Sequence, residues 1–262
     1  MDNTKIKSHV WLDLAVTLFG LSVVSYFYYG ERFLLLSGVC LGVSCTAEII
    51  CSKLMHKKFD DFHFISDAMM ISLMLPAVFS LKIAGLACIF AVIVTKNIFG
   101  GKDNMIFSPA AAAYVFMLTS WKDNLLKYPE PNTKYQAGEK ITDLVYSASH
   151  NFNMEGKTDI SDFDLMLGNF SGASGTVIIP VLVVSAVVLI LRRDISAGAF
   201  FGTVAGTVLM AFIIPATDDM IQSAKYSLCM NMTLFSAIYI VSDRRTAPEK
   251  DYYAFSTDFS QP

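Results

Sequence analysis

The chain has 262 residues, of which 54% are hydrophobic and 16% are charged, and its mean hydropathy is +0.49. A soluble domain carries about 25% charged residues, so this composition excludes a soluble enzyme and a disordered chain. The formal net charge of -3 gives no basic footprint, which argues against nucleic acid as a partner.

Two early apolar runs are long enough to cross a membrane as helices. Val10–Tyr29 and Phe33–Cys51 each approach the ~20 residues that span a hydrocarbon core. Lysines precede the first run, as in a signal peptide, but the run is too long for an h-region and no small-residue cleavage site follows it. We therefore expect a retained membrane anchor.

Three shorter apolar stretches follow, at Ala68–Leu81, Ile83–Val94 and Pro109–Trp121. Each is too short for a simple span, so either its flanks extend it or it belongs to a broken or re-entrant helix. We expect at least one discontinuous helix in this region, and we expect Lys96 to lie in a polar turn.

Three later apolar runs complete the pattern, at Ser174–Leu191, Ile195–Ile214 and Tyr226–Val241. The sequence therefore predicts an all-α integral membrane protein with about eight transmembrane segments. Trp121–Ala173 is the only long polar segment and is the natural place for chemistry outside the membrane. The five cysteines show no CxxC or His-rich spacing, so we expect buried thiols rather than a metal site or disulfides.

Basic residues of the short loops gather on one side of this topology. With a cytoplasmic amino terminus, the cytoplasmic side receives Lys53, Lys57, Lys58, Lys96, Lys102, Arg192, Arg193, Arg244, Arg245 and Lys250. Because basic loops resist translocation, we expect both termini in the cytoplasm. The segment Trp121–Ala173, which holds five Lys against eight Asp and Glu, is then extracytoplasmic.

The stretch FGGKDNMIFSPAAAAYVFMLTSW, Phe99–Trp121, carries the strongest local signals. Gly100-Gly101 permits a tight turn, and Ser108 followed by Pro109 predicts a helix that begins at Ser108 as its N-cap. The unpaired N–H groups of such a helix start can hold an anionic group. The alternative is a helix start that is capped only by Ser108.

This stretch also resembles a known family. It is similar to the GGxGxNxFNPA segment of the D subunit of the Rnf electron-transport complex and of the B subunit of the sodium-pumping NADH:quinone oxidoreductase. The matching residues are Gly100, Gly101, Asn104, Phe107, Pro109 and Ala110, and Ser108 replaces the usual Asn.

Three more segments match the family in the same order. Phe163–Arg193 resembles its LGNxGGSIGExSALALLLGGLYLLxRR stretch, with Gly172 and Gly175 in register at a glycine-rich helix entry. Ile238–Pro248, IYIVSDRRTAP, resembles FFxATDPVTSP, and Asp143–Ser149, DLVYSAS, occupies the place of DxVSGAT. The resemblance covers residues from about 60 to 250.

The resemblance implies ten spans in two five-helix repeats, so we expect the second repeat of this chain to be incomplete. The expected organisation is a first transmembrane repeat at 1–120, an extracytoplasmic flavin loop at 121–173, a second, incomplete repeat at 174–242 and a cytoplasmic tail at 243–262.

The resemblance also implies a flavin site. FMN is joined by a phosphoester to the last residue of the family motif, which here is Ser149, with Asp143 six residues before it. Ser147 stands where the family has Gly, and the bulkier Tyr146 stands where the family has Ser or Thr. The second SGAS string, Ser171–Ser174, is interpreted as a decoy because Gly168 stands where Asp would be required.

A second, non-covalent flavin is the ligand that the resemblance suggests for Gly100, Gly101, Asn104 and Ser108. Glu48 is the candidate for an ion pathway, either as a proton or ion relay or as a solvated carboxylate near the cytoplasmic end of its span. Asp13 and Asp67 are expected at the interface.

The implied function is that of a membrane subunit of a flavin-dependent electron-transport complex, coupled to Na+ or H+ movement, in the bacterial cytoplasmic membrane. Its partners would be other membrane subunits of the complex, a flavinylated partner subunit and a flavin transferase. The alternatives are a non-redox membrane scaffold for a flavinylated partner and a small-solute transporter. In-gel fluorescence of a covalent flavin separates the first reading from the others.

Overall fold

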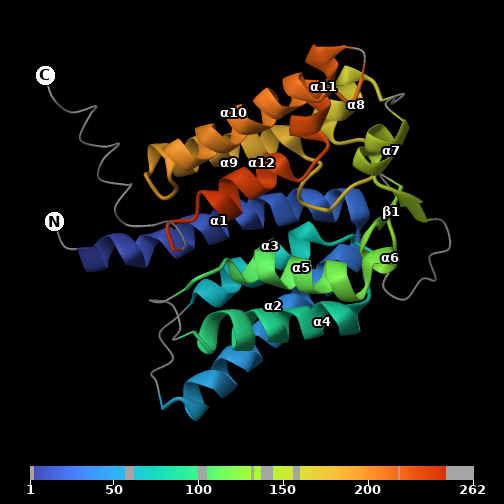
Figure 1. The fold of residues 1–262 in the computed structure, drawn as a ribbon. Coiled ribbons are helices and arrows are strands. Elements are labelled where there is room, and N and C mark those ends of the chain that lie inside the picture. Colours follow the sequence, from blue (N-terminus) through green and yellow to red (C-terminus); the bar gives the residue numbers. More distant parts are fainter. Residues whose placement is uncertain are drawn as a thin grey trace, which may run out of the picture.

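The computed structural model describes residues 3–56, 62–99, 105–130, 133–136, 144–155, 160–217 and 219–245. The chain is mostly helical, and the longer helices run side by side in one elongated bundle (Figure 1). A small two-stranded sheet departs from the all-α expectation. It lies at one end of the bundle.

Two long helices open the fold. These are α1 (Asn3–Tyr29) and α2 (Glu31–Leu54), and they are joined at Gly30, whose φ of 73° suits glycine. Both predicted runs are helical, and Val10–Tyr29 and Glu31–Leu54 are the described helices long and apolar enough to cross a membrane by length and composition.

The next predicted span is interrupted. The helix α3 (His63–Met74) ends before Leu75, which is extended with φ -90° and ψ 153°, because Pro76 disfavours helical geometry in the residue before it. The apolar stretch Ala68–Leu81 is therefore helical only as far as Met74, and the expectation of a broken or re-entrant helix in this region stays a prediction. The chain resumes as α4 (Leu81–Phe90).

A π-helix extends α4 into a segment that the sequence predicted as a turn. It is η1 (Ala91–Asn97), and it includes Lys96. It is followed, after the residues that are not described, by α5 (Pro109–Ser120) and the short α6 (Lys122–Leu125).

The long polar segment carries its own secondary structure. Strand β1 (Lys127–Pro129) pairs antiparallel with β2 (Leu144–Tyr146), with Tyr128 opposite Val145. Two short helices follow, α7 (Ala148–Glu155) and α8 (Asp162–Leu167).

The last part of the chain forms shorter helices than the sequence predicts. They are α9 (Ile179–Leu191), α10 (Ala197–Ile213), α11 (Met220–Cys229), α12 (Thr233–Ser236) and the π-helix η2 (Ala237–Val241). Two predicted spans are therefore not continuous helices. Ser174–Leu191 becomes helical only at Ile179, and Tyr226–Val241 is interrupted after Cys229.

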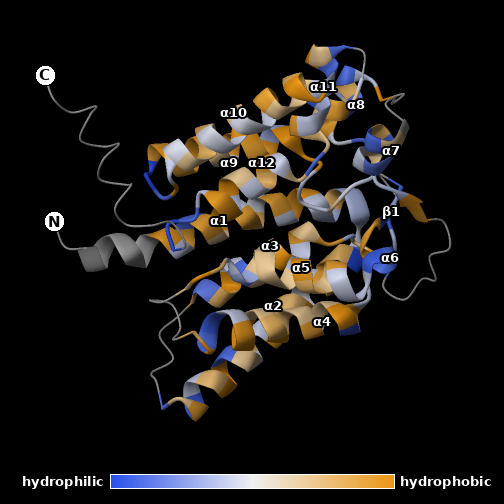
Figure 2. Cartoon of the chain, in the orientation of Figure 1, coloured by the Kyte–Doolittle hydropathy of each residue, from blue (hydrophilic) through white to orange (hydrophobic). Residues whose placement is uncertain are grey.

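The core centres on α3, which lies between α1, α2 and α5. Nearly every residue of α3 is buried, whereas the outer face of α10 exposes large apolar side chains such as Leu209 and Ile213. Figure 2 shows hydrophobic residues on outward faces of the helices and hydrophilic residues toward the two ends of the bundle. This distribution is typical of a protein whose helix surfaces contact lipid.

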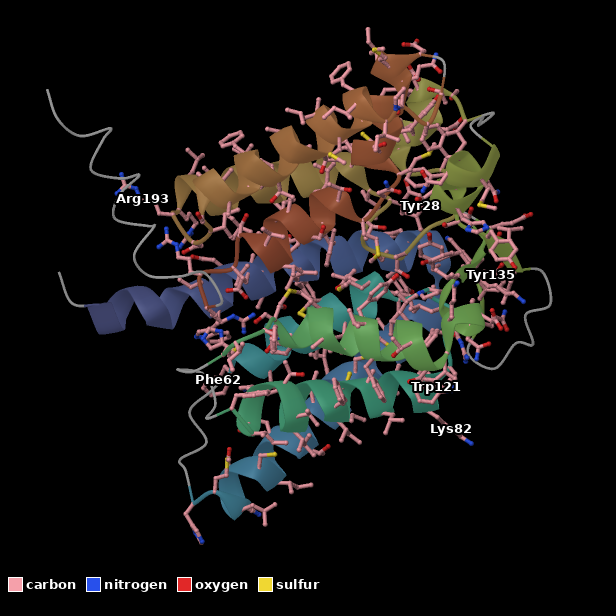
Figure 3. All side chains as sticks on the ribbon, in the orientation of Figure 1. Tyr28, Phe62, Lys82, Trp121, Tyr135 and Arg193 are labelled. Atoms are coloured by element: carbon pink, nitrogen blue, oxygen red, sulfur yellow. The ribbon has the colours of Figure 1, made fainter. Side chains whose placement is uncertain are left out.

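Successive loops alternate between the two ends of the bundle. Figure 3 shows Phe62 and Arg193 at one end and Lys82, Trp121 and Tyr135 at the other. The alternation agrees with the order of loops predicted from the basic residues. The sheet and α7 lie at the end of the bundle (Figure 1) where Figure 3 labels Tyr135, opposite Arg193.

Candidate functional site

The candidate attachment residue Ser149 lies in the first turn of α7. Ser147 precedes this helix, and its Oγ accepts a hydrogen bond from the backbone N–H of His150 at 3.1 Å. That is the contact of an N-cap, so Ser147 fixes the start of α7. A glycine, which the family motif has at this position, could not make the contact.

The hydroxyl of Ser149 is held by a residue that the sequence did not indicate. Ser149 Oγ donates a short hydrogen bond to Oδ1 of Asn231, which lies between α11 and α12, 82 residues further along the chain. The side chain of Ser149 is half-buried. No local motif around Asn231 predicts the contact, since it depends on the packing of the last helices against α7.

Tyr146 and His150, from the same segment as Ser149, form an aromatic pair. The rings of Tyr146 and His150 are stacked, with centroids 4.7 Å apart and an angle of 26° between the planes. Tyr146 is exposed. The bulk of Tyr146 is therefore turned onto His150.

The two SGAS-like strings are hydrogen-bonded to each other. The backbone N–H of Ala148 donates to the carbonyl oxygen of Ser171 at 2.9 Å, and Ser171 Oγ donates to the carbonyl oxygen of Tyr146 at 3.1 Å. The second string therefore supports the turn that carries Ser149. Its interpretation as a decoy for flavin attachment stays a prediction.

Gly172 and Gly175 lie where other backbone or side chains approach closely. A Cβ atom on Gly175 would be 2.6 Å from Cβ of Leu73, and one on Gly172 would be 2.8 Å from Cγ1 of Val177. The Gly175 N–H donates to the carbonyl oxygen of Leu73 at 2.8 Å. Gly175 lets the segment before α9 pack against the end of α3, and Gly172 lets that segment fold closely on its own Val177. A cofactor contact by either glycine stays a prediction.

Ser174 completes this junction. Its N–H and its Oγ both donate to the carbonyl oxygen of Leu75, at 3.3 and 3.0 Å, and its own carbonyl oxygen accepts from Ser25 Oγ at 2.8 Å. The carbonyl groups at the end of α3 are therefore satisfied by backbone and hydroxyl groups of the segment before α9, and Ser25 of α1 holds that segment in turn.

Ser108 occupies the N-cap position of α5, as predicted, with Pro109 in the first turn. Its hydroxyl does not make the expected cap hydrogen bond. Ser108 Oγ is buried and has no hydrogen-bond partner among the described residues. Ser108 lines an open apolar groove with Phe107 and with the stacked rings of Phe90 and Phe116. Gly100, Gly101 and Asn104 lie outside the described residues, as does Asp143.

The carboxylate of Glu48 is buried and paired, so the solvated alternative was wrong. Its Oε2 lies 3.1 Å from Lys96 Nζ and accepts from Asn97 Nδ2 at 3.3 Å. Both partners come from η1. Lys96 is itself buried within the π-helix, which corrects its placement in a polar turn.

Asp13 and Asp67 are also buried within the protein, and their expected position at the membrane interface stays a prediction. Asp13 Oδ2 lies 2.9 Å from Arg192 Nε, and Asp67 Oδ1 lies 2.8 Å from Arg245 Nη2. Each carboxylate faces a basic residue from much later in the chain, which the sequence could not indicate. Among the described residues, no cluster of His, Cys, Asp and Glu suits a metal ion.

Comparison with known proteins identifies a family for this chain and several partial relatives. The model of the NQR2, RnfD, RnfE family matches residues 1–253. Three similar proteins are each described as the D subunit of an ion-translocating oxidoreductase complex. They come from Shewanella amazonensis (26% identical over 130 residues, 48% of this chain and 37% of the relative), Colwellia psychrerythraea (25% over 165 residues, 59% and 45%) and Haemophilus influenzae strain 86-028NP (26% over 152 residues, 55% and 42%). The matched part thus spans less than half the length of these relatives.

Proposed function

Because the chain belongs to the NQR2, RnfD, RnfE family, we propose that it is a membrane subunit of a flavin-dependent electron-transport complex. Electron transfer through this complex is coupled to movement of Na+ or H+. The observation that carries the proposal is the family match over residues 1–253, and the two long apolar helices support the membrane location. Other membrane subunits supply the electron donor and acceptor sites.

FMN joined to Ser149 is the cofactor of this proposal. The hydroxyl of Ser149 can form a phosphoester, and Ser147 and Ser171 hold the turn that presents it. The flavin supplies the redox chemistry, while the chain positions it and controls its surroundings. Asn231 accepts the hydroxyl hydrogen before attachment, and its amide group can contact a phosphate afterwards.

A non-covalent flavin is proposed for the groove beside Ser108. The Ser108 hydroxyl is buried and has no hydrogen-bond partner within the described part of the chain. Together with the stacked rings of Phe90 and Phe116, it suits a ligand that is aromatic and has polar edges. The N–H groups at the start of α5 suit its anionic or carbonyl groups.

The attachment proposal is tested by the intact mass of the protein after co-expression with its own flavin transferase. We expect one added FMN group in the wild-type chain and none in Ser149→Ala. Ser174→Ala is the matched control, because it removes a hydroxyl from the second SGAS string and leaves Ser149 intact. Flavin released on denaturation measures the non-covalent ligand in the same samples.

Two outcomes contradict the attachment proposal. Added mass that persists in Ser149→Ala but is lost in Ser174→Ala moves the attachment to the second string. Wild-type protein with neither covalent nor released flavin favours the alternative function, a membrane scaffold for a flavinylated partner. Loss of the partner subunit from the membrane on deletion of this chain then supports the scaffold.

The proposed location is the bacterial cytoplasmic membrane, with both termini in the cytoplasm and α7 outside. The one-sided basic clusters support this orientation. The placement of Arg193 at the end of the bundle opposite Tyr135 agrees with it (Figure 3). We further propose about eight spans, several of them built from shorter helices.

A further inference from the structure

Two cysteine side chains meet inside the bundle. Cys40 lies on α2 and Cys88 lies on α4, and both are fully buried. Both are free thiols, and they interact with each other as hydrogen-bonding partners. Neither belongs to a CxxC string, so the packing of α2 against α4 is what brings the two thiols together.

The helices that carry the two thiols are in close contact. Figure 1 shows α2 and α4 side by side, and a Cβ atom on Gly85 would lie 3.6 Å from Cγ2 of Val43. About two turns beyond the cysteines on both helices, Glu48 Oε2 lies 3.1 Å from Lys96 Nζ. The ion pair and the thiol pair thus belong to one interface, and both fix the position of α2 relative to α4.

A buried serine makes the two thiols unequal. Ser44 lies one turn after Cys40 on α2, and its hydroxyl faces the sulfur of Cys88. Two groups that can donate, the Cys40 thiol and the Ser44 hydroxyl, are therefore directed at the Cys88 sulfur. Because donors stabilise a thiolate and the thiolate is the nucleophile in thiol chemistry, Cys88 is the better placed of the two to react first.

The surroundings of the thiol pair favour a disulfide over a bound metal ion. Leu36 and Ala84, one turn before each cysteine, are apolar and fully buried. Two thiolates around a monovalent soft cation would place a net negative charge in this apolar interior, which is costly. A disulfide is uncharged, so it can form here without that cost.

We propose that Cys40 and Cys88 are a modification site, an oxidisable dithiol that forms a disulfide between α2 and α4. The reactant is an uncharged two-electron oxidant, such as an azo compound or a quinone, that reaches the pair from the lipid side. The outer face of α4 is open to that side, since Leu86 and Ile89 are exposed. This inference goes beyond the proposed flavin chemistry and does not depend on it.

With an azo oxidant, the reaction has two bond-forming steps. The sulfur of Cys88 adds to one nitrogen of the N=N bond, and its proton passes to the other nitrogen. The sulfur of Cys40 then attacks the sulfur of Cys88, so that the S–S bond forms, the S–N bond breaks and the Cys40 proton goes to the released nitrogen. The two thiols lose two electrons and two protons, and the azo compound is reduced to a hydrazine.

The test oxidises the folded full chain in detergent with diamide, an uncharged azo compound, removes the diamide, and denatures the protein in N-ethylmaleimide. The intact mass then counts the maleimide groups. Three of the five cysteines should react in the oxidised wild-type chain, and all five should react when a reducing step precedes the maleimide. Peptide mapping without reduction should find the Cys40 peptide joined to the Cys88 peptide.

Cys45→Ser is the matched control for Cys40→Ser, because Cys45 is a half-buried free thiol on the same helix. After oxidation, two thiols should stay protected in Cys45→Ser, whereas all four remaining thiols should react in Cys40→Ser. If Cys40→Ser does not fold, the peptide map of the wild-type chain gives the answer. Five reactive thiols in the oxidised wild type, protection that persists in Cys40→Ser, or a map that joins other cysteines overturns the inference.

Discussion

The carboxyl group of Asp194 illustrates how one residue can make this fold depend on pH. Asp194 lies in the turn between α9 and α10, and it shares Arg192 with Asp13. Burial, followed by the hydrogen bond and the negative charge of Asp13, raises the pKa of Asp194 to about 6. Arg192 and Arg244 act in the opposite direction but do not cancel the rise.

This raised pKa predicts a stability that falls as pH increases. Between about pH 4 and pH 6 the folded chain holds a proton on Asp194 that the unfolded chain has already lost, so the proton stabilises the folded state. The contribution is present at the acidic end of this window and is lost as pH rises through about 6. Unfolding midpoints of the detergent-solubilised protein should show this slope.

Asp194→Asn should flatten that slope over the same window. The amide keeps the size of the side chain and does not titrate. Asp164→Asn is a suitable control, because the pKa of Asp164 is lowered by hydrogen bonds from Ser161 and Asn169 and its effect lies at more acidic pH. An unchanged slope in Asp194→Asn would show that another group titrates in this range.

The π-helix η1 is joined to α2 by a buried ion pair. Lys96 and Asn97, both on η1, meet Glu48 of α2. Asn97 Nδ2 also donates to the carbonyl oxygen of Val92 at 2.9 Å, within η1 itself. The pair thus joins α2 to the irregular end of α4.

We expect the two charges of this pair to be strongly coupled. Glu48→Gln or Lys96→Met alone leaves one buried charge without its partner, at a cost of about 3–5 kcal/mol. The double variant removes both charges and should be more stable than either single variant. The fraction of protein that stays folded after heating in detergent is measured by size-exclusion chromatography. It ranks the stabilities of the wild type, the two single variants and the double variant.

The coupling also bears on the candidate ion pathway. Additive losses in the double variant would mean that Glu48 and Lys96 act separately, and Glu48 would then be available to a mobile ion. Strong coupling would favour a structural role for Glu48.

Sequence patterns predict the elements of this fold better than their junctions. The long apolar runs predict α1 and α2, and Ser108-Pro109 correctly locates the start of α5. The end of α3 before Pro76 follows a local steric rule and was within reach of the sequence.

The remaining contacts depend on which distant segments meet. Asn231 meets Ser149 across 82 residues, and Arg245 meets Asp67 across 178 residues. A hydroxyl or carboxylate carries no local signal of its partner. The candidate site was therefore predicted at Ser149 and Ser147 but not at Asn231.

At the scale of the whole molecule, the alternation of loops between the two ends predicts a labelling pattern. A cysteine placed at Lys134, next to Tyr135, should react with an impermeant thiol reagent in intact cells, whereas one at Lys53 should react only after the cells are opened. The basic loops, which resist translocation, are the physical reason. A chain whose five native cysteines are replaced by alanine provides the background. If only the cysteine at position 53 reacts in intact cells, the orientation is the reverse of the proposed one and α7 lies in the cytoplasm.

The junction between Ser174 and the broken end of α3 has a consequence for how the protein is made. Leu75 is translated 99 residues before Ser174, whose N–H and Oγ satisfy the Leu75 carbonyl group. Until the ribosome reaches Gly175, the growing chain holds α1 to α5 with the Leu73 and Leu75 carbonyl groups lacking these partners, which is costly in hydrocarbon. The end of α3 therefore cannot complete its hydrogen bonds during translation until the segment before α9 has been made.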